Sequence, residues 1–595
     1  MRLHITKSAN ATCFYVIKSV RIKGKNTSQI VEKLGNLEQV KLKAGDQDPY
    51  EWAKAYAEKL TREEKEQNRT VLIPLNQAVQ IPKDTVLRFN GGYLFLQKIC
   101  SKLKLKDICK AIERRHKFKF NLYSILSRLI YCRITNPTSK LGTFEYSQHL
   151  LEPPDFDLHQ IYRALSVIAE ESDYIQERLY LNSKSVVNRN TDILYYDCTN
   201  YFFEIEQEEG MKQYGACKEN RPLPIVEMGL LMDGNGIPLA FCIHEGNRNE
   251  QTTLKPLEEQ ILKDFGLSKF IVCTDAGLSS ANNKFFNSRK DREFITATSV
   301  KKLPQERRER LIQPTGWKLV GGDDQKTYNL TEIDADENAK RFYYDKTFYK
   351  EEWFIDTVEL FDDDLQKTVK RDLSQRLIIT FSFKYKAYLQ AIRDRRVERA
   401  QKLIKQGDKA VNRRGRNDVR EYIQEVSYTD SGEIAENKTF ALNDDAIMEA
   451  ARFDGYYAVY TSLDTKKYPV TKVNDLNHGR WEIEECFRIM KSEFLARPVY
   501  LKRDDRIKAH FMTCFIALLV LRILEYKIDH QFTYPEIIDC LSEMDFTRIK
   551  DAGYIPSYTR TDMTDKLHDT FGFRMDYEIM TPEAMKKIFA LTKKA

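Results

Sequence analysis

The sequence predicts an α/β fold in which a mixed sheet is flanked by helices. Two observations indicate the sheet. Short apolar runs follow one another from residue 191 to residue 300, and the strong turn signal Asp233–Gly236 joins two of them as a hairpin. Later runs follow in strand–helix–strand order, which adds strands beyond the hairpin. A third observation bears on function, because acidic residues stand at the ends of two of these runs.

The first 90 residues predict an N-terminal α+β domain, residues 1–90. Cys13–Ile17 is typical of a short strand, whereas Tyr50–Leu60 is typical of a helix. The pair Gly91–Gly92 then interrupts the chain before a different kind of sequence begins.

The next region, residues 91–188, predicts a helical domain. Its runs Leu122–Tyr131 and Ile161–Ile168 carry apolar residues at helical spacing. Basic residues are interspersed among these runs. The domain is therefore either in contact with DNA or a solvated helical scaffold, and both interpretations stay open.

The sheet is expected to begin in residues 189–300. Its expected strands are Ile193–Thr199, Tyr201–Ile205, Ile225–Met232, Ile237–Ile243, Phe270–Thr274 and Phe294–Thr298. A further apolar run, Phe453–Thr461, is expected to rejoin the same sheet, so that residues 453–530 supply the rest of this core. Residues 531–595 are expected to form a C-terminal helical region.

A long stretch of chain separates the parts of this core. Asp275 and Glu484 are 209 positions apart, which is far more than one connection between neighbouring elements needs. We therefore expect an inserted domain at residues 301–452. Its middle has short polar strands around Trp317 and Trp353, followed by a basic segment.

The composition is that of an ordinary soluble protein of several structural units, with 595 residues, 42% apolar and 31% charged. Its eleven cysteines are scattered singly and include no Cys-x-x-Cys pair, which supports neither a zinc ribbon nor a disulfide framework and favours a reducing cytoplasm. The N-terminus lacks an apolar signal core, and the longest apolar stretch, Phe511–Val520, is too short to span a bilayer. We expect no membrane partner.

The net charge of +7 is mild for this length, but its distribution is uneven. Phe381–Glu421 has thirteen Lys and Arg against five Asp and Glu, an excess of eight positive charges that exceeds the charge of the whole chain. A solvated helix is the usual meaning of such a run. Contact with the DNA phosphate backbone is the preferred interpretation, because pairing with Asp394 and Glu398 cannot neutralise the segment. The residues expected to bind DNA are Lys384, Lys386, Arg393, Arg395, Arg396, Arg399, Arg413, Arg414 and Arg416.

Three acidic residues are the candidate catalytic groups. Asp197 follows one apolar run and Asp275 follows another, whereas Glu484 lies in a predicted helix. A carboxylate at the end of a buried strand is held rigidly at the open edge of a sheet, where ligands collect. Taken singly, Asp197 could cap a turn and Asp275 could cap a helix. Together the three can hold a pair of divalent metal ions for phosphoryl transfer.

The helix predicted for Arg480–Phe494 places charged residues on one face. At about 100° per residue, Glu484 falls about 40° from Arg480 and Lys491 falls about 20° from it. Ile483, Phe487, Met490 and Phe494 form an adjacent apolar stripe. Arg480 and Lys491 suit a DNA phosphate and Glu484 suits a hard cation, although a surface ion pair between Arg480 and Glu484 is the alternative.

This signature resembles that of DDE transposases of bacterial insertion sequences, in the group marked by Tyr-x2-Arg-x3-Glu-x6-Lys. Arg480, Glu484 and Lys491 match its arginine, glutamate and lysine with the correct spacing. Asn477 occupies its tyrosine position, which departs from the pattern.

Other segments carry the same resemblance. Tyr196–Thr199 is similar to the family's first-aspartate strand, and Asp275–Gly277 is similar to its second-aspartate motif. Gly215–Arg221, Gly236–Leu239 and Glu245–Glu250 also match, with a cysteine at position 217 where serine is common.

The resemblance implies an RNase H-like mixed-sheet catalytic core, interrupted by a largely β insertion domain, with helical N-terminal and C-terminal regions. The core comprises the two sheet-forming ranges given above, and the insertion lies between them. The resemblance further implies that Asp197, Asp275 and Glu484 hold two Mg²⁺ ions, for which Mn²⁺ can substitute. Arg480 and Lys491 are then expected to position DNA phosphate.

The implied activity is that of a transposase that binds the terminal inverted repeats of an insertion sequence, cleaves DNA and joins the 3′-hydroxyl ends to target DNA. An RNase H-like nuclease without strand transfer and a catalytically inactive, domesticated DNA-binding protein are the alternatives. A transposon has two ends and one site holds one scissile phosphate, so we expect a homodimer assembled on DNA. The expected location is the bacterial cytoplasm, in association with the nucleoid.

Overall fold

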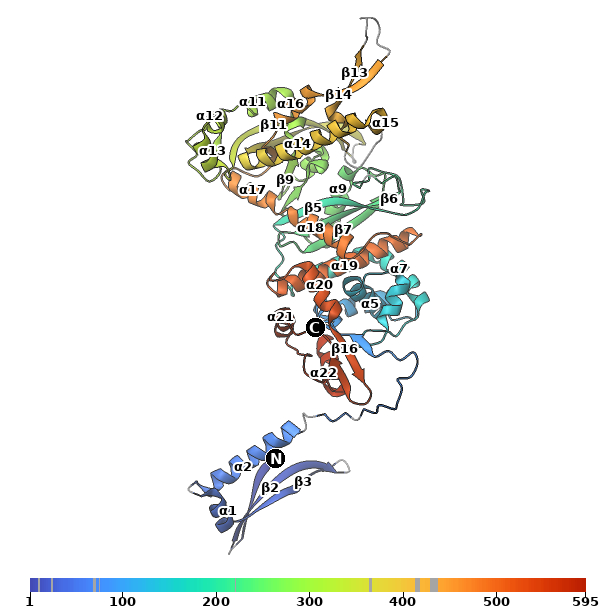
Figure 1. Cartoon of the computed structure of the whole chain (residues 1–595), viewed down its shortest axis with the longest axis vertical. Helices are drawn as coiled ribbons and strands as arrows, with labels where there is room; N and C mark the ends of the chain where they lie inside the picture. The colour runs from blue at the N-terminus through green and yellow to red at the C-terminus, as the bar shows by residue number, and fades with distance from the viewer. Residues whose placement is uncertain are drawn as a thin grey trace. The chain divides into compact units, whose positions relative to one another are not determined.

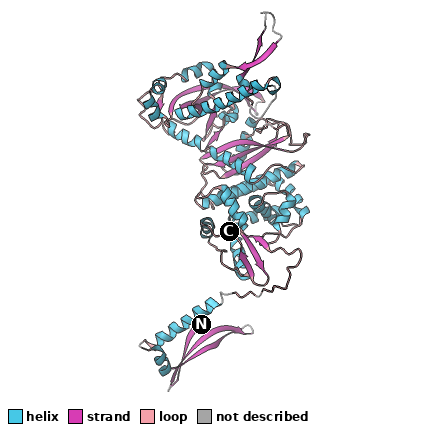
Figure 2. Cartoon of the chain, in the orientation of Figure 1, coloured by secondary structure: helices cyan, strands magenta, loops and turns pink. Residues whose placement is uncertain are grey.

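A computed structural model of the chain describes residues 1–594 except 9–10, 23–24, 46, 68–70, 74, 220, 363–365, 412–417 and 429–436. The chain divides into two compact units, and each is described by itself. The first comprises Met1–Leu87, Thr547–Pro556 and Asp576–Glu583, and the second comprises Arg88–Phe546, Ser557–Met575 and Ala584–Ala595. Figure 1 labels the elements, and Figure 2 distinguishes helices from strands.

The first unit contains a small antiparallel sheet with two helices. The sheet has the order β1-β2-β3 and is formed by Arg2–Ser8, Ala11–Ile22 and Lys25–Asn36. Helices α1 (Leu37–Ala44) and α2 (Pro49–Gln67) follow, and β17 (Gly553–Pro556) belongs to the same unit. Phe14 and Val16 pack with Val40, Ala53 and Ala57 in one apolar core. The strand and the helix predicted for this part of the chain are confirmed within β2 and α2.

The second unit begins with β4 (Arg88–Asn90) and a group of helices. These are α3 (Tyr93–Lys102), α4 (Leu105–Arg115), α5 (Leu122–Thr135), α6 (Lys140–Ser147), α7 (Leu158–Glu170) and α8 (Ser172–Ser183). The two predicted helices are confirmed within α5 and α7. The chain ends with α20 (Tyr534–Glu543), β16 (Asp545–Ile549), α21 (Asp562–Phe571) and α22 (Pro582–Thr592).

Helix α19 (Asp504–Lys527) lies at the centre of this group and contacts α3, α5 and α7. By length and composition it could cross a membrane, yet 94% of its most apolar window is buried inside the structure. It also contacts strand β7 (Pro238–Glu245), so it joins the helical region to the sheet. Its apolar residues therefore form protein core.

Nine strands form one mixed sheet, in the order β10-β11-β12-β15-β9-β8-β5-β6-β7. Its central members are β5 (Ile193–Phe202), β6 (Ile225–Asp233), β8 (Phe270–Thr274), β9 (Arg292–Thr298) and β15 (Tyr456–Thr461). Strand β8 runs parallel to both β5 and β9, whereas the other neighbours are antiparallel. The predicted mixed sheet with helices is confirmed, and the run ending at Thr461 does rejoin it as β15. Strand β5 contains the first strand expected within residues 193–205 and the first two residues of the second. Asp197 therefore lies inside a strand, and the prediction that it stands at a strand end is wrong.

Residues 301–452 differ from the largely β region that was expected. Their strands are β10 (Lys318–Leu319), β11 (Phe348–Asp362), β12 (Lys367–Phe381), β13 (Ile423–Tyr428) and β14 (Asn437–Leu442). Their helices are α11 (Gln305–Leu311), α12 (Leu330–Ala335), α13 (Glu337–Tyr343), α14 (Phe383–Gln406), α15 (Asp408–Val411) and α16 (Asp444–Ala451). The description as largely β is therefore wrong.

Strands β10, β11 and β12 of this region belong to the nine-stranded sheet, whereas β13 and β14 form a separate two-stranded sheet. Strand β12 pairs with β15 from Arg376↔Thr461 to Phe381↔Tyr456, and β11 pairs along the other side of β12. Leu377, Ile379 and Phe381 of β12 enter the same apolar core as the central strands. A separate insertion domain with the predicted limits stays a prediction.

Candidate active site

Strand β5 turns alternate side chains to opposite faces of the sheet. On one face, Leu194, Tyr196 and Cys198 are buried in the apolar core. Leu257 and Ile261 of α9 (Leu254–Asp264) pack into that core as well. This face anchors the strand.

The other face of β5 meets the segment that follows β15. The Tyr195 hydroxyl donates a hydrogen bond of 2.9 Å to the carbonyl oxygen of Leu476, and Lys491 Nζ donates one of 2.6 Å to Thr199 Oγ1. Asp197 lies between Tyr195 and Thr199 in the alternation, so it is turned to the same side. The period of the strand therefore brings Asp197 under the segment that carries the predicted signature.

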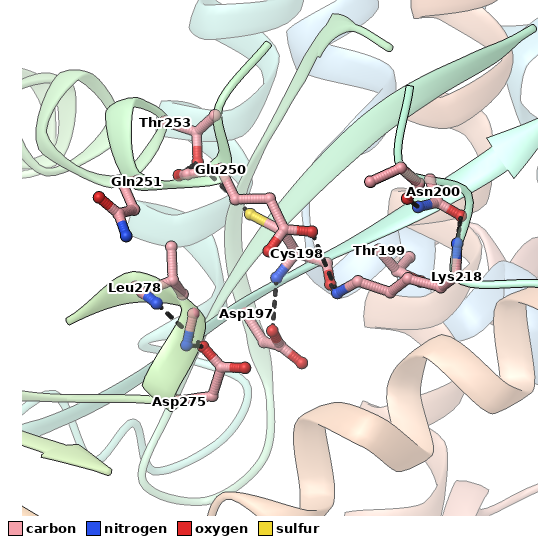
Figure 3. Close-up of polar contacts among 12 residues, drawn as sticks. Asp197, Cys198, Thr199, Asn200, Lys218, Glu250, Gln251, Thr253, Asp275 and Leu278 are labelled. Carbon is pink, nitrogen blue, oxygen red and sulfur yellow. Dashed lines mark hydrogen bonds and ion pairs between the residues drawn. The ribbon is translucent and has the colours of Figure 1, made fainter. Parts of the chain in front are cut away.

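Asp197 lies in β5, and Asp275 follows the neighbouring parallel strand β8. Strand β5 pairs with β8 from Ile193↔Ile271 to Tyr195↔Cys273. Continued by two residues, this register would set Asp197 opposite Asp275, the residue that follows β8. Figure 3 shows the two carboxylates turned toward a common space. The parallel neighbours β5 and β8 therefore bring the two predicted aspartates close together.

Asp275 uses one carboxylate oxygen to cap a short 3-10 helix, η2 (Ala276–Leu278). Its Oδ1 accepts hydrogen bonds from the backbone N–H groups of Gly277, at 2.9 Å, and Leu278, at 3.2 Å. Its Oδ2 takes part in neither bond. The capping role weighed from the sequence is thus present, and it fixes the side chain while leaving one oxygen for another partner.

The electrostatic setting of Asp197 is unfavourable for a carboxylate. Burial and the charge of Asp275 together raise the pKa of Asp197 to about 6, although Lys218 and Arg480 act in the opposite direction. One oxygen of Asp197 accepts a hydrogen bond of 2.7 Å from the backbone of Cys198. Two carboxylates with excess negative charge are the donor set that Mg²⁺ or Mn²⁺ prefers, so the residues present fit such an ion.

The helix predicted for Arg480–Phe494 is not a continuous α-helix. After α17 (Val470–His478), the chain forms α18 (Trp481–Arg488) and then a π-helical turn, η5 (Ile489–Glu493). A π turn bonds residue i to i+5, so the constant 100° per residue assumed for Arg480, Glu484 and Lys491 does not apply across it. The prediction of one continuous α-helix is therefore wrong, and the shared face of the three residues stays a prediction. The apolar stripe is confirmed, because Ile483, Phe487, Met490 and Phe494 are all buried.

Glu484 and Arg480 line a cavity of about 560 Å³. Trp481 also lines it and is 53% exposed. Asn477, which occupies the tyrosine position of the signature, donates a hydrogen bond of 3.1 Å to the hydroxyl of Tyr457 on β15. Tyr457 also lines this cavity.

The structure brings two of the three predicted carboxylates together. Asp197 and Asp275 interact through their charges, whereas Glu484 is exposed on α18. Within the part of the chain that the structure describes, no three Asp, Glu, His or Cys side chains form a ready metal cluster. Glu484 therefore does not form a cluster of three carboxylates with Asp197 and Asp275 in this conformation.

The two predicted phosphate-positioning residues lie on either side of Asp197. Arg480 Nη1 is 3.5 Å from the carbonyl oxygen of Thr274, the residue before Asp275. Burial, together with the charge of Lys218, lowers the pKa of Lys491 to about 8. Arg480 therefore lies beside Thr274, next to Asp275, and Lys491 binds Thr199, two residues after Asp197.

Two charged residues at this edge were not assigned a role from the sequence. Lys218 Nζ donates to the carbonyl oxygen of Cys198 and lies 3.3 Å from Oε1 of Glu250 (Figure 3). Both residues fall in segments that resemble the family, Gly215–Arg221 and Glu245–Glu250. That resemblance could have marked them as candidate site residues. Their proximity to Asp197 depends on two loops, which local patterns do not place.

The basic helix α14 has more acidic partners than its own sequence provides. Four of its predicted DNA-binding residues form ion pairs with acids from other elements: Lys384 with Asp345, Lys386 with Asp334, Arg393 with Asp454, and Arg396 with Glu421. Arg395 and Arg399 are exposed. Arg413, Arg414 and Arg416 lie outside the described residues. The surplus positive charge of the described helix is therefore smaller than its sequence suggests.

One family model matches more than half of the chain. The family model of the transposase DDE domain matches residues 202–520, a range that contains Asp275 and Glu484 and begins shortly after Asp197. A cryo-EM structure of the piggyBac transposase synaptic complex with hairpin DNA is similar at 9% sequence identity and a TM-score of 0.31, covering 76% of this chain and 78% of that chain. No curated protein matches the sequence.

Proposed function

Because this chain belongs to the family of DDE transposases, which are DNA-cleaving enzymes, we propose that it is the transposase of a bacterial insertion sequence. In this proposal it binds the terminal inverted repeats of the element, cleaves DNA there and joins the 3′-hydroxyl ends to target DNA. It acts in the bacterial cytoplasm, in association with the nucleoid.

The observation that carries the proposal is the proximity of Asp197 and Asp275, which belong to or follow the neighbouring parallel strands β5 and β8 and interact through their charges. These two residues and Glu484 would hold two Mg²⁺ ions, or Mn²⁺ in their place. When bound, such ions activate a water or a 3′-hydroxyl for attack on a phosphodiester and stabilise the leaving oxygen. Glu484 is exposed on α18. In this proposal it would join the aspartates when DNA and metal bind.

The chain's own cations would hold the DNA. Arg480 and Lys491 lie close to the aspartates, where they would bind the phosphate next to the scissile bond. Exposed cations of α14, such as Arg395 and Arg399, would contact the phosphate backbone further away. An RNase H-like core with an inserted domain is the architecture proposed for these parts.

A strand-transfer assay tests this function against its two alternatives. Full-length protein is incubated with labelled terminal-repeat DNA, target plasmid and Mg²⁺. Joined product is expected. Cut but unjoined DNA would favour a nuclease without strand transfer, and bound but uncut DNA would favour a domesticated binding protein.

The active form is proposed to be a homodimer on DNA. Coordinated insertion of two transposon ends needs two active sites at a fixed separation, and a two-fold assembly is the simplest closed arrangement. Light scattering of the protein with terminal-repeat DNA measures the stoichiometry. A strand-transferring complex of one protein with one DNA end would contradict the dimer.

A further inference from the structure

Glu250 is a carboxylate beside the two aspartates that the proposed mechanism leaves unused. It begins the 3-10 helix η1 (Glu250–Thr252), which connects β7 to α9. A Cβ atom on Gly277 would lie 3.5 Å from Oε2 of Glu250 and 3.5 Å from Oδ2 of Asp275. The carboxylate of Glu250 and the uncommitted oxygen of Asp275 therefore border the same small space.

A lysine ammonium already stands between Glu250 and the strand of Asp197. Lys218 Nζ lies 3.3 Å from Oε1 of Glu250, and its charge acts on Asp197 to lower the pKa of that carboxyl. Figure 3 shows the Lys218 side chain reaching toward Glu250 and the strand that carries Asp197. An internal cation thus links these carboxylates in the described conformation.

A second observation shows that this cation does not satisfy the acidic groups. Glu227 of β6 is only 4% exposed, and its Oε2 has no hydrogen-bond partner among the described residues. Its carboxyl lies close enough to Glu250 for the two acidic groups to interact. A buried acid aimed at Glu250 without a full set of partners indicates a site with too little positive charge.

We propose that Glu250 is a further metal-holding residue of this site, whose carboxylate leaves Lys218 and binds a divalent cation together with Asp275 and Asp197. The proposal rests on the proposed function, because it assumes that the aspartates hold metal. Lys218 is then released, and its ammonium is available to a DNA phosphate. The divalent cation brings two positive charges to Glu250 in place of the single charge of the Lys218 ammonium.

Binding of Mn²⁺ to the full-length protein tests the proposal without depending on activity. Electron paramagnetic resonance gives the free Mn²⁺ concentration, with and without duplex DNA. Glu250→Gln is expected to weaken Mn²⁺ affinity by about tenfold or more, as loss of groups in or around a metal shell does. Glu250→Asp keeps the charge but shortens the side chain, so it is expected to weaken binding as well. The matched control is Glu259→Gln on α9, which should bind within about twofold of wild type.

Two outcomes would overturn the proposal. If Asp275→Asn loses Mn²⁺ while Glu250→Gln binds like wild type, Glu250 is not a ligand, although the proposed function stands. If wild type does not bind Mn²⁺, or Asp275→Asn binds as wild type does, the metal-dependent function fails together with the proposal. Thermal denaturation checks that each variant folds, and Glu250→Asp serves if Glu250→Gln does not.

A background variant separates a metal ligand from a residue that merely positions Lys218. In Lys218→Met protein, Glu250 has lost its ammonium partner. A metal ligand still gives about a tenfold loss of Mn²⁺ affinity when Glu250→Gln is added. A positioning role predicts no further loss in that background and would overturn the proposal.

Discussion

Two regions of the molecule carry several charged residues: the strand edge, by which we mean the part of β5 and β8 beside Asp197 and Asp275, and the helix α14. The partners of these charges differ between the two regions. On α14, Arg393 is paired with Asp454 and Arg396 with Glu421, so acids brought by the tertiary fold offset the cations. At the strand edge, Asp197 and Asp275 have like charges and lie close together, and the pKa of Asp197 is raised by burial and by Asp275.

This difference distinguishes charged residues that stabilise the fold from charged residues that bind a ligand. A paired cation such as Arg393 stabilises packing, and its loss leaves a buried carboxylate alone. Two carboxylates held side by side lower the stability of the protein, and such a pair indicates a site that binds a cation. Four substitutions or conditions can break or sharpen the comparison.

The largest expected effect is at the strand edge. Asp197→Asn should abolish detectable cleavage of terminal-repeat DNA, because the amide cannot replace a charged metal ligand. The loss should exceed the roughly 100-fold seen when an outer-shell partner of a metal ligand is removed. A gel assay with Mg²⁺ or Mn²⁺ measures it, and end binding by gel shift is the control. Cleavage at the wild-type rate would remove Asp197 from the site.

The next effect concerns the anchoring of α14. Arg393→Gln should lower the free energy of unfolding by about 3 kcal/mol, because it leaves the partly buried Asp454 without its partner. Urea denaturation measures the change. Adding Asp454→Asn should restore part of the stability, and Arg395→Gln is the exposed control. Unchanged stability in Arg393→Gln, with weaker DNA binding, would make Arg393 a DNA contact instead.

The pH dependence of the free energy of unfolding should reveal the raised pKa of Asp197. Because its folded pKa is raised to about 6, the folded state binds the proton more tightly than the unfolded state does. Its contribution to stability is therefore present at low pH and falls by up to about 3 kcal/mol as the pH rises from roughly 4 to 7. Comparing urea denaturation of wild type and Asp197→Asn at several pH values isolates this part. Parallel pH profiles would contradict it.

The smallest expected effect concerns the exposed cations of α14. Replacing both Arg395 and Arg399 with Gln should flatten the slope of log affinity for duplex DNA against log salt by roughly two units. Stability should stay within about 0.5 kcal/mol of wild type, since both side chains are exposed. Fluorescence anisotropy at several salt concentrations gives the slope. An unchanged slope would leave this face of α14 as solvated surface.

Much of the core was predictable because strand signals are local. The apolar runs that became β5, β6, β7, β8 and β9 could be recognised, and so could the acids that follow two of them. The segment after Arg480 was less predictable, since a π-helical turn replaces the regular helix that its apolar spacing suggested. Residues 301–452 were least predictable, because the paired strands β11 and β12 join the central strands only through the pairing of β12 with β15, which lies beyond this region.

The sequence by itself determined that Asp197 and Asp275 follow apolar runs and that Arg480, Glu484 and Lys491 occur at the spacing of a known signature. Only the tertiary structure decided that the two aspartates lie close together, that Lys218 and Glu250 lie beside them, and that acids from other elements offset α14. The physical reason is the range of the interactions. Periodicity is set by neighbours within a few residues, whereas strand register, loop packing and ion pairs join residues that are far apart in the chain.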